Sequence, residues 1–208
     1  MIKNIVFDLG GVIAHLVKER SIERFEQIGV HDISKILDAY VQTGIFLAVE
    51  DGSLSKEEFR VQLSKHVGKE LTHDEIFGAY MGFVAEIPQY KLDYIEMLKK
   101  EYNIYILSNT NPYIMEFSES SDFSEKGLPL SHYYHKKFAS FEMGAVKPNR
   151  KIFDKMIEET GLIPQETLFV DDGPQNIAIG KELGFITYQP NNFEDWRWNI
   201  TRIIEKHK

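Results

Sequence analysis

The chain has 208 residues, of which 43% are hydrophobic and 27% are charged, as is ordinary for a globular protein. This length suits one domain, or a compact core that carries an inserted subdomain. The formal net charge of -8 gives no general attraction to nucleic acid or to anionic membranes. The absence of cysteine excludes disulfides, thiolate zinc sites and cysteine nucleophiles.

The N-terminal apolar run is too short for a signal peptide and leads directly into a glycine pair. No uninterrupted apolar run reaches the roughly 20 residues that are needed to span a bilayer. We therefore expect a cytoplasmic protein without a membrane segment.

The first expected element is a strand at residues 2–7, a β-branched and aromatic run that ends at Asp8. A continuous apolar run of this length is typical of a strand that is buried on both faces. The Gly10-Gly11 pair then stops the strand and turns the chain.

Residues 16–86 show helical patterns instead. Apolar stripes at 22–28 and 36–41 follow helical spacing, and Ser55 with Glu58 and Thr72 with Glu75 form capping boxes. The second box is followed by Ile76, Tyr80 and Val84, and no strand is expected in this stretch. Tyr40, Phe46 and Tyr80 are expected to pack in its core, with the lining of a substrate pocket as the alternative.

The α/β alternation resumes at Pro88. Strands are expected at 104–107, 136–141, 167–170 and 185–188, and helices at 92–98, 152–157, 177–183 and 196–203. Residues 118–132, rich in Ser and Glu, are interpreted as a solvated loop. Alternating strands and helices favour a parallel sheet with helices on both faces. The pattern predicts an α/β core from residues 1–15 and 87–208, with 16–86 as an inserted all-helical subdomain.

Three of these strands end in polar residues, at Asp8, at Ser108-Asn109 and at Asp171-Asp172. In parallel sheets ligands bind at the carboxyl ends of the strands, so these groups are expected to share one site. Clustered carboxylates repel one another unless a cation lies among them. An oxygen-rich site of this kind suits Mg²⁺.

The same edge could bind a phosphate. Ser108, Asn109 and Lys147 supply donors for phosphate oxygens, and a lysine stabilises charge in the transition state. With Asp8 as the attacking carboxylate, the parts needed for phosphoryl transfer to a carboxylate are present.

These segments, taken together, resemble a known family. Phe-Asp-Leu-Gly-Gly-Val at 7–12, Ser-Asn-Thr-Asn at 108–111, Lys-Pro at 147–148 and Asp-Asp at 171–172 are similar to the four motifs of the haloacid dehalogenase superfamily. The resemblance covers essentially the whole chain. It implies a Rossmann-like α/β core with a parallel sheet, and it makes the helical insert a small cap of the C1 type.

The resemblance also implies roles at the metal site. Asp8 would be the nucleophile and a ligand of Mg²⁺, the backbone carbonyl of Gly10 a second ligand and Asp172 a third. Asp171 would bind the metal through water or orient the ligands.

For the substrate, the resemblance implies that Ser108 and Asn109 hold the phosphate and that Lys147 bridges it to Asp8. The segments 50–55 and 142–144 look closest to a branch of bacterial sugar-phosphate phosphatases that act on glucose 1-phosphate. The prediction is a Mg²⁺-dependent phosphatase that hydrolyses a small phosphorylated metabolite, such as a hexose 1-phosphate, through an aspartyl phosphate.

One position departs from the usual motif. Most phosphatases of the superfamily carry a general acid-base Asp where this chain has Gly10, and such help is typically worth about 10²–10⁴-fold. His15 or Glu50 could substitute for it. The alternatives are a phosphate-binding or regulatory protein with little or no turnover, a metal-independent dehalogenase and a phosphomutase.

Overall fold

The computed structural model describes residues 1–36 and 43–208, and its centre is a five-stranded sheet in the order β5-β4-β1-β6-β7. All neighbouring strands run parallel, so the predicted fold class is confirmed. The strands are β1 (Asn4–Phe7), β4 (Asn103–Ser108), β5 (Lys136–Ala139), β6 (Thr167–Val170) and β7 (Ile186–Tyr188).

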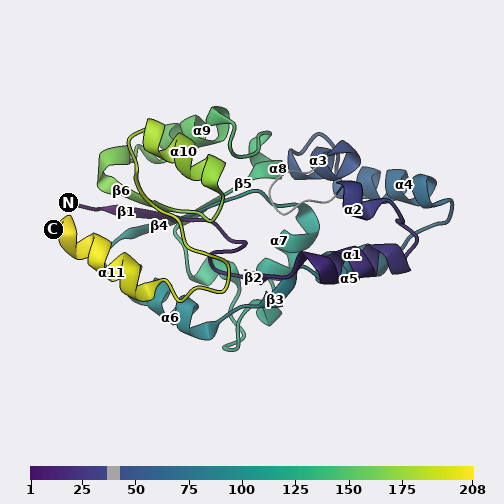
Figure 1. The fold of residues 1–208 in the computed structure, drawn as a ribbon, viewed down its shortest axis with the longest axis horizontal. Coiled ribbons are helices and arrows are strands. Elements are labelled where there is room, and N and C mark those ends of the chain that lie inside the picture. Colours follow the sequence, from purple (N-terminus) through teal and green to yellow (C-terminus); the bar gives the residue numbers. More distant parts are fainter. Residues whose placement is uncertain (37–42) are drawn as a thin grey trace.

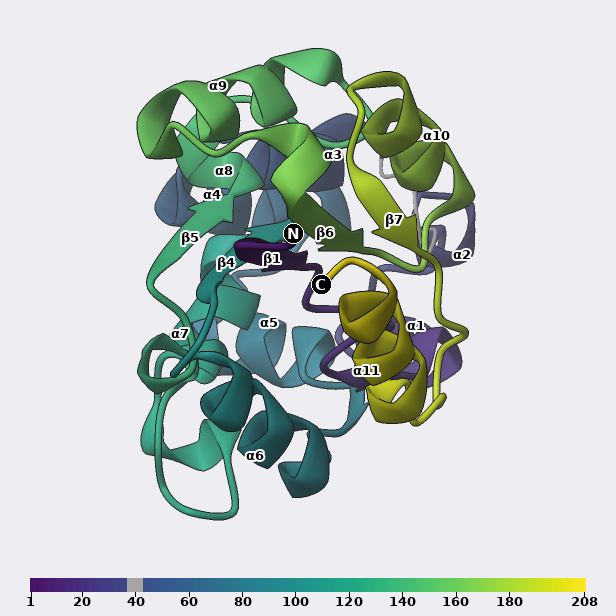
Figure 2. The ribbon, with the colours of Figure 1, turned by 90° about the vertical axis from the view of Figure 1, so that its left-hand side faces the viewer.

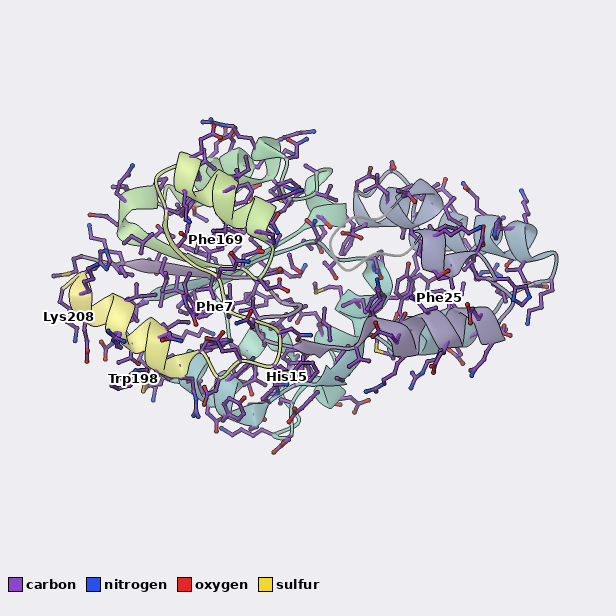
Figure 3. All side chains as sticks on the ribbon, in the orientation of Figure 1. Phe7, His15, Phe25, Phe169, Trp198 and Lys208 are labelled. Atoms are coloured by element: carbon purple, nitrogen blue, oxygen red, sulfur yellow. The ribbon has the colours of Figure 1, made fainter. Side chains whose placement is uncertain are left out.

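Helices cover both faces of this sheet (Figures 1 and 2). On one face lie α6 (Gln89–Leu98) and α11 (Arg197–Lys206), and on the other α9 (Arg150–Thr160) and α10 (Pro174–Glu182). Phe7 packs in the first layer and Phe169 in the second, on opposite sides of the sheet (Figure 3). Burial on both faces explains the uninterrupted apolar runs of the strands.

The register of the strands brings the predicted site residues together. Phe7, the last residue of β1, pairs with Ile106 on one side and with Val170 on the other. The backbone N–H of Asp8 still donates to the carbonyl of Val170 at 2.9 Å. Asp8 and Asp171 therefore leave the sheet side by side.

Beyond this edge of the sheet lies a group of helices with a hydrophobic core of its own (Figure 1). The helices are α1 (Lys18–Gln27), α2 (Ile33–Ile36), α3 (Gly44–Glu50), α4 (Lys56–Val67) and α5 (His73–Tyr80). Phe25, Phe46 and Tyr80 pack there mostly edge to face, a geometry that aromatic rings favour. Tyr113, from α7 (Pro112–Ser118), stacks on Tyr80 with a centroid distance of 5.3 Å.

Both predicted capping boxes are confirmed, at the starts of α4 and α5. The expectation that no strand lies in 16–86 is wrong, because β2 (His15–Leu16) and β3 (Val84–Glu86) form an antiparallel pair. Such short strands show no alternation that a sequence pattern could reveal. The β2–β3 pair joins the segment that enters the helical group to the segment that leaves it. The limits of this group at residues 16 and 86 stay predictions. Within the expected 36–41 stripe, Leu37, Tyr40 and Val41 lie outside the described residues.

The interpretation of 118–132 as a solvated loop is also wrong in part. Short 3₁₀ turns at Ser121–Phe123 and Leu130–His132 bury Phe123 and Leu130 against the core. The preceding helix α7 was not predicted. It begins after Asn111, whose side-chain oxygen accepts hydrogen bonds from the backbone N–H groups of Tyr113 and Ile114. Strand β5 is likewise shorter than expected, because the short helix α8 (Ser140–Met143) follows it directly.

Within the described ranges, no helix combines the length and the apolar character that crossing a membrane requires.

The loop after β1 is held by two buried side chains. The indole N–H of Trp196 and the ammonium group of Lys91 both donate to the carbonyl of Val12, at 2.8 and 2.7 Å. Trp196 also packs on Phe7, with a centroid distance of 5.4 Å. These contacts connect the C-terminal segment to the turn that carries Gly10 and Gly11.

We predict that Trp196→Phe lowers the free energy of unfolding by about 1–3 kcal/mol, because it removes a buried hydrogen bond and packing volume. The control is Trp198→Phe, since Trp198 is 70% exposed and Trp196 is fully buried. The control is expected to stay within about 0.5 kcal/mol of the parent protein. Urea unfolding measures both, and equal losses in the two variants would contradict this account.

Candidate active site

A cavity of about 370 Å³ lies between the carboxyl edge of the sheet and the helical group. Polar groups of the core line one side and aromatic side chains of α3 and α5 line the other. The core side includes Asp8, Gly10, Ser108, Asn109, Lys147 and Asp172, and the opposite side includes Phe46, Glu50 and Tyr80. Phe46 and Tyr80 thus pack in a core and also line this cavity.

Three carboxylates cluster on the core side of the cavity, and two of them, Asp8 and Asp172, line it. One oxygen from each of Asp8, Asp171 and Asp172 lies within 4.8 Å of the others. Asp8 is 9% exposed, and burial raises the pKa of its carboxyl from 3.8 to about 7, with the charges of Asp171 and Asp172 adding to the shift and Lys147 opposing it. The cluster is short of positive charge.

Lys147 supplies the one cation that the described residues place inside this cluster. Its ammonium nitrogen lies 2.6 Å from Oδ2 of Asp171, 3.1 Å from Oδ1 of Asp8 and 2.8 Å from the carbonyl oxygen of Leu107. Burial lowers the pKa of Lys147, but the two carboxylates outweigh burial and the net shift is upward. The side chain is therefore a buried ammonium ion with all three donors engaged.

Asp171 is fully buried and holds Lys147 in place. Its Oδ2 accepts from Lys147, while its Oδ1 accepts from the backbone N–H of Gly173 at 2.8 Å and from Nδ2 of Asn176 at 2.9 Å. Asp171 does not line the cavity, whereas the partly exposed Asp172 does.

Asn109 lines the cavity and also makes two hydrogen bonds to the backbone of Lys147. Its side-chain oxygen accepts from the backbone N–H of Lys147 at 2.7 Å, and its amide donates to the Lys147 carbonyl at 2.9 Å. These two hydrogen bonds position the backbone of Lys147. Thr110, to which the sequence assigned no role, lines the same cavity with a buried hydroxyl that has no hydrogen-bond partner in the described structure.

The two glycines after β1 are packed tightly. Gly11 has a φ of +72°, and a β-carbon there would lie 2.1 Å from Oδ2 of Asp172. A β-carbon on Gly10 would lie 2.8 Å from Cδ1 of Leu16, so that an apolar side chain occupies the space beside this position. Glycine at 11 thus lets the turn approach the Asp172 carboxylate closely.

The donor set fits Mg²⁺, which prefers a few carboxylate and carbonyl oxygens with room for water. Asp8 and Asp172 offer carboxylate oxygens toward the cavity. Burial is the main reason that the pKa of Asp8 is raised, and a divalent cation would offset the carboxylate repulsion that adds to it.

Of the two predicted substitutes for the acid-base residue, the structure places only Glu50 at the cavity. His15 is 4% exposed, and its Nδ1 lies 3.1 Å from a carboxylate oxygen of Glu86 (Figure 3). Its ring packs on Phe193 at 4.7 Å, and His15 is not among the residues that line the cavity.

Comparison with known proteins identifies the family. Residues 2–184 match the model of the haloacid dehalogenase-like hydrolases, and the chain belongs to this family. It is 50% identical over 204 residues to a D-ribitol-5-phosphate phosphatase of Bacteroides thetaiotaomicron, with 98% of this chain and 99% of the relative covered.

Solved structures agree with this assignment. A predicted HAD-like hydrolase from Porphyromonas gingivalis superposes with a TM-score of 0.95 at 49% identity, over 98% of each chain. A HAD family enzyme of B. thetaiotaomicron, crystallised as an Asp-to-Ala variant with magnesium and inorganic phosphate, superposes with a TM-score of 0.91 at 36% identity, over 96% of this chain and 99% of that chain. The predicted family is confirmed.

We predict that Gly11→Ala weakens Mg²⁺ binding on the order of 10–100-fold, because the new methyl group displaces the Asp172 carboxylate. Gly127→Ala is the matched control, since Gly127 has a similar φ of +70° with nothing within 4 Å of the added carbon. Isothermal titration with Mg²⁺ measures both variants. Equal affinity in Gly11→Ala and the control would show that this close approach does not shape the metal site.

We predict a pH-dependent effect of Asp8→Asn on stability in EDTA. The raised pKa of Asp8 means that the free energy of unfolding of the parent protein falls as the pH rises from about 4 through about 7, because the unfolded chain releases this proton first. Asn does not ionise, so its free energy of unfolding should not fall in this way. Between pH 4 and pH 8 the free energy of unfolding of the variant should therefore rise by about 1–3 kcal/mol relative to that of the parent. Chemical unfolding at both pH values tests this, and a constant difference would contradict it.

Proposed function

We propose that this chain is a Mg²⁺-dependent phosphatase that hydrolyses a small phosphorylated polyol or sugar through an aspartyl phosphate on Asp8. The observation that carries the proposal is the Asp8 carboxylate, which faces the cavity beside a buried ammonium ion and a second carboxylate. A carboxylate in this setting can attack a phosphate whose charge a cation screens.

The broader class of enzyme is confirmed. The chain is a hydrolase of phosphoric monoesters, as its curated relative of 50% identity is a phosphatase that matches it over nearly its whole length. Magnesium as the cofactor agrees with the magnesium complex of the related enzyme.

We assign the chain's own groups as follows. One oxygen of Asp8 attacks phosphorus, while the ammonium group of Lys147 holds Asp8 and neutralises charge on the phosphate. Asp8, Asp172 and the carbonyl of Gly10 would hold Mg²⁺, which when bound draws charge from the phosphate oxygens. Asp171 does not contact the substrate in this scheme; it holds Lys147 in place by accepting a hydrogen bond from its ammonium group.

The phosphate itself would meet hydroxyl groups at the end of β4. Ser108 and Thr110 line the cavity, and the Thr110 hydroxyl has no partner in the described structure. Asn109 supports this site indirectly, through its two hydrogen bonds to the backbone of Lys147.

The substrate must be small. A cavity of about 370 Å³ lies near the lower end of the range of about 300–1,000 Å³ that is common for ligand sites. Ribitol 5-phosphate, on which the curated relative acts, is the leading candidate, and hexose 1-phosphates such as glucose 1-phosphate are the second. A metal-independent dehalogenase is disfavoured, because that chemistry does not require the carboxylate cluster of Asp8, Asp171 and Asp172.

The test is phosphate release from a panel of polyol and sugar phosphates that includes ribitol 5-phosphate and glucose 1-phosphate. We expect turnover that requires Mg²⁺, that EDTA abolishes and that Asp8→Asn lowers by about 10³-fold or more. The exposed Asp122→Asn serves as the control and should keep the parent rate.

Two outcomes would count against the proposal. Mg²⁺ and phosphate binding without turnover on any member of the panel would favour the phosphate-binding or regulatory alternative. Undiminished turnover in Asp8→Asn would exclude the aspartyl phosphate.

A further inference from the structure

Expelling an alkoxide from a phosphate ester requires a proton donor near the leaving oxygen. On the core side of the cavity, Gly10 carries no side chain, and Leu16 occupies the space into which a side chain at this position would extend. Lys147 is already engaged with two carboxylates and a carbonyl. A donor for the leaving group must therefore come from the opposite wall.

Glu50, the last residue of α3, lies on that wall. Two contacts with the core fix its backbone. Oγ of Ser140 lies 2.6 Å from the carbonyl oxygen of Glu50, and Gly52 lies so close to the carbonyl of Phe141 that a β-carbon would be 2.1 Å from that oxygen. The carboxyl group is therefore held over the site by the same segment that follows β5.

The Glu50 carboxyl is poised for proton transfer. It makes no hydrogen bond or ion pair with the described residues, although it lines a cavity that also contains Asp8 and Lys147. Burial raises the pKa of Glu50 to about 7, with Lys147 opposing the shift and the charges of Asp8 and Asp51 adding to it. A pKa near the working pH is the value that general acid-base catalysis favours.

Tyr80, on the same wall, provides a second observation. Its hydroxyl is buried and has no hydrogen-bond partner in the described structure, and the charge of Glu50 contributes to the raised pKa of this phenol. Two polar groups, from α3 and α5, thus line the cavity without a hydrogen-bond partner among residues 1–36 and 43–208. Buried polar groups normally have a hydrogen-bond partner, so the Tyr80 hydroxyl is suited to contact the alcohol part of a substrate beside Glu50.

We infer that Glu50 is the general acid-base of the reaction, supplied from the helical group in place of the missing side chain at Gly10. This inference rests on the proposed function. The other glutamate of the cavity lining, Glu19, is a weaker candidate, because it is exposed to solvent.

The two chemical steps balance as follows. In the first, an oxygen of Asp8 bonds to phosphorus, the bond from phosphorus to the ester oxygen breaks, and that oxygen takes the proton of Glu50 to leave as an alcohol. In the second, the Glu50 carboxylate takes a proton from water, whose oxygen bonds to phosphorus. The bond to Asp8 then breaks, which releases inorganic phosphate and restores both side chains.

The test compares Glu50→Gln with the parent protein in Mg²⁺, on ribitol 5-phosphate and on p-nitrophenyl phosphate. Nitrophenolate leaves without a proton, whereas a polyol does not. We expect Glu50→Gln to lower the first turnover of ribitol 5-phosphate by about 10²–10⁴-fold. On p-nitrophenyl phosphate it should keep a rapid first release of nitrophenolate, followed by slow turnover, because the second step still lacks its base.

Controls separate chemistry from folding. Glu23→Gln should behave like the parent protein on both substrates, because Glu23 is exposed and lies outside the cavity lining. Thermal unfolding checks that Glu50→Gln is folded. If Glu50→Gln does not fold, Glu50→Asp replaces it, since Asp keeps the carboxyl group on a shorter side chain. Its first turnover should be slowed more on ribitol 5-phosphate than on p-nitrophenyl phosphate, by a smaller factor than in Glu50→Gln.

Two results would overturn the inference. One is that Glu50→Gln hydrolyses ribitol 5-phosphate at the parent rate. The other is that Glu50→Gln lowers the rate of the first turnover equally on both substrates. Failure of the proposed function is distinguishable. In that case either the parent protein would release no nitrophenolate, or the rapid release would persist in Asp8→Asn, whatever the behaviour of the Glu50 variants.

Discussion

The buried ammonium group of Lys147 is the interaction on which the rest of the site depends. It lies between Asp8 and Asp171, in a pocket where unpaired charge is costly. Asp171 is held in turn by Gly173 and Asn176, and the backbone of Lys147 is held by Asn109. Among the described residues, one ammonium ion lies within a cluster of three carboxyl groups, so the cluster is short of positive charge. For this reason it suits a divalent metal ion together with an anionic substrate.

The molecule divides its chemistry between two walls of one cavity. The edge of the sheet supplies the carboxylates, the ammonium ion and the hydroxyl groups of Ser108 and Thr110. The helical group supplies aromatic surface, from Phe46 and Tyr80, and the carboxyl group of Glu50. Ser140 joins the walls, because its hydroxyl contacts the carbonyls of both Glu50 and Thr110.

Much of this arrangement could be predicted from the sequence. The strand ends at Asp8, Ser108 and Asp171 follow from apolar runs that stop at polar residues, and parallel pairing then places them on one edge. The β2–β3 pair could not be predicted, since two or three residues carry no pattern. The pairing of Asn109 with Lys147 could not be predicted, and the sequence named Glu50 without a basis for preferring it to His15. Both depend on packing between segments that are far apart in the chain.

The central claim is that Asp8 carries the phosphoryl group during turnover. The most direct measurement mixes the protein with an excess of ribitol 5-phosphate and Mg²⁺, quenches in acid within the first turnover and maps the peptides by mass spectrometry. The account predicts a hydroxylamine-sensitive phosphoryl group on Asp8. Phosphate release at full rate with Asp8 unmodified throughout, or a phosphoryl group on a different residue, would contradict it.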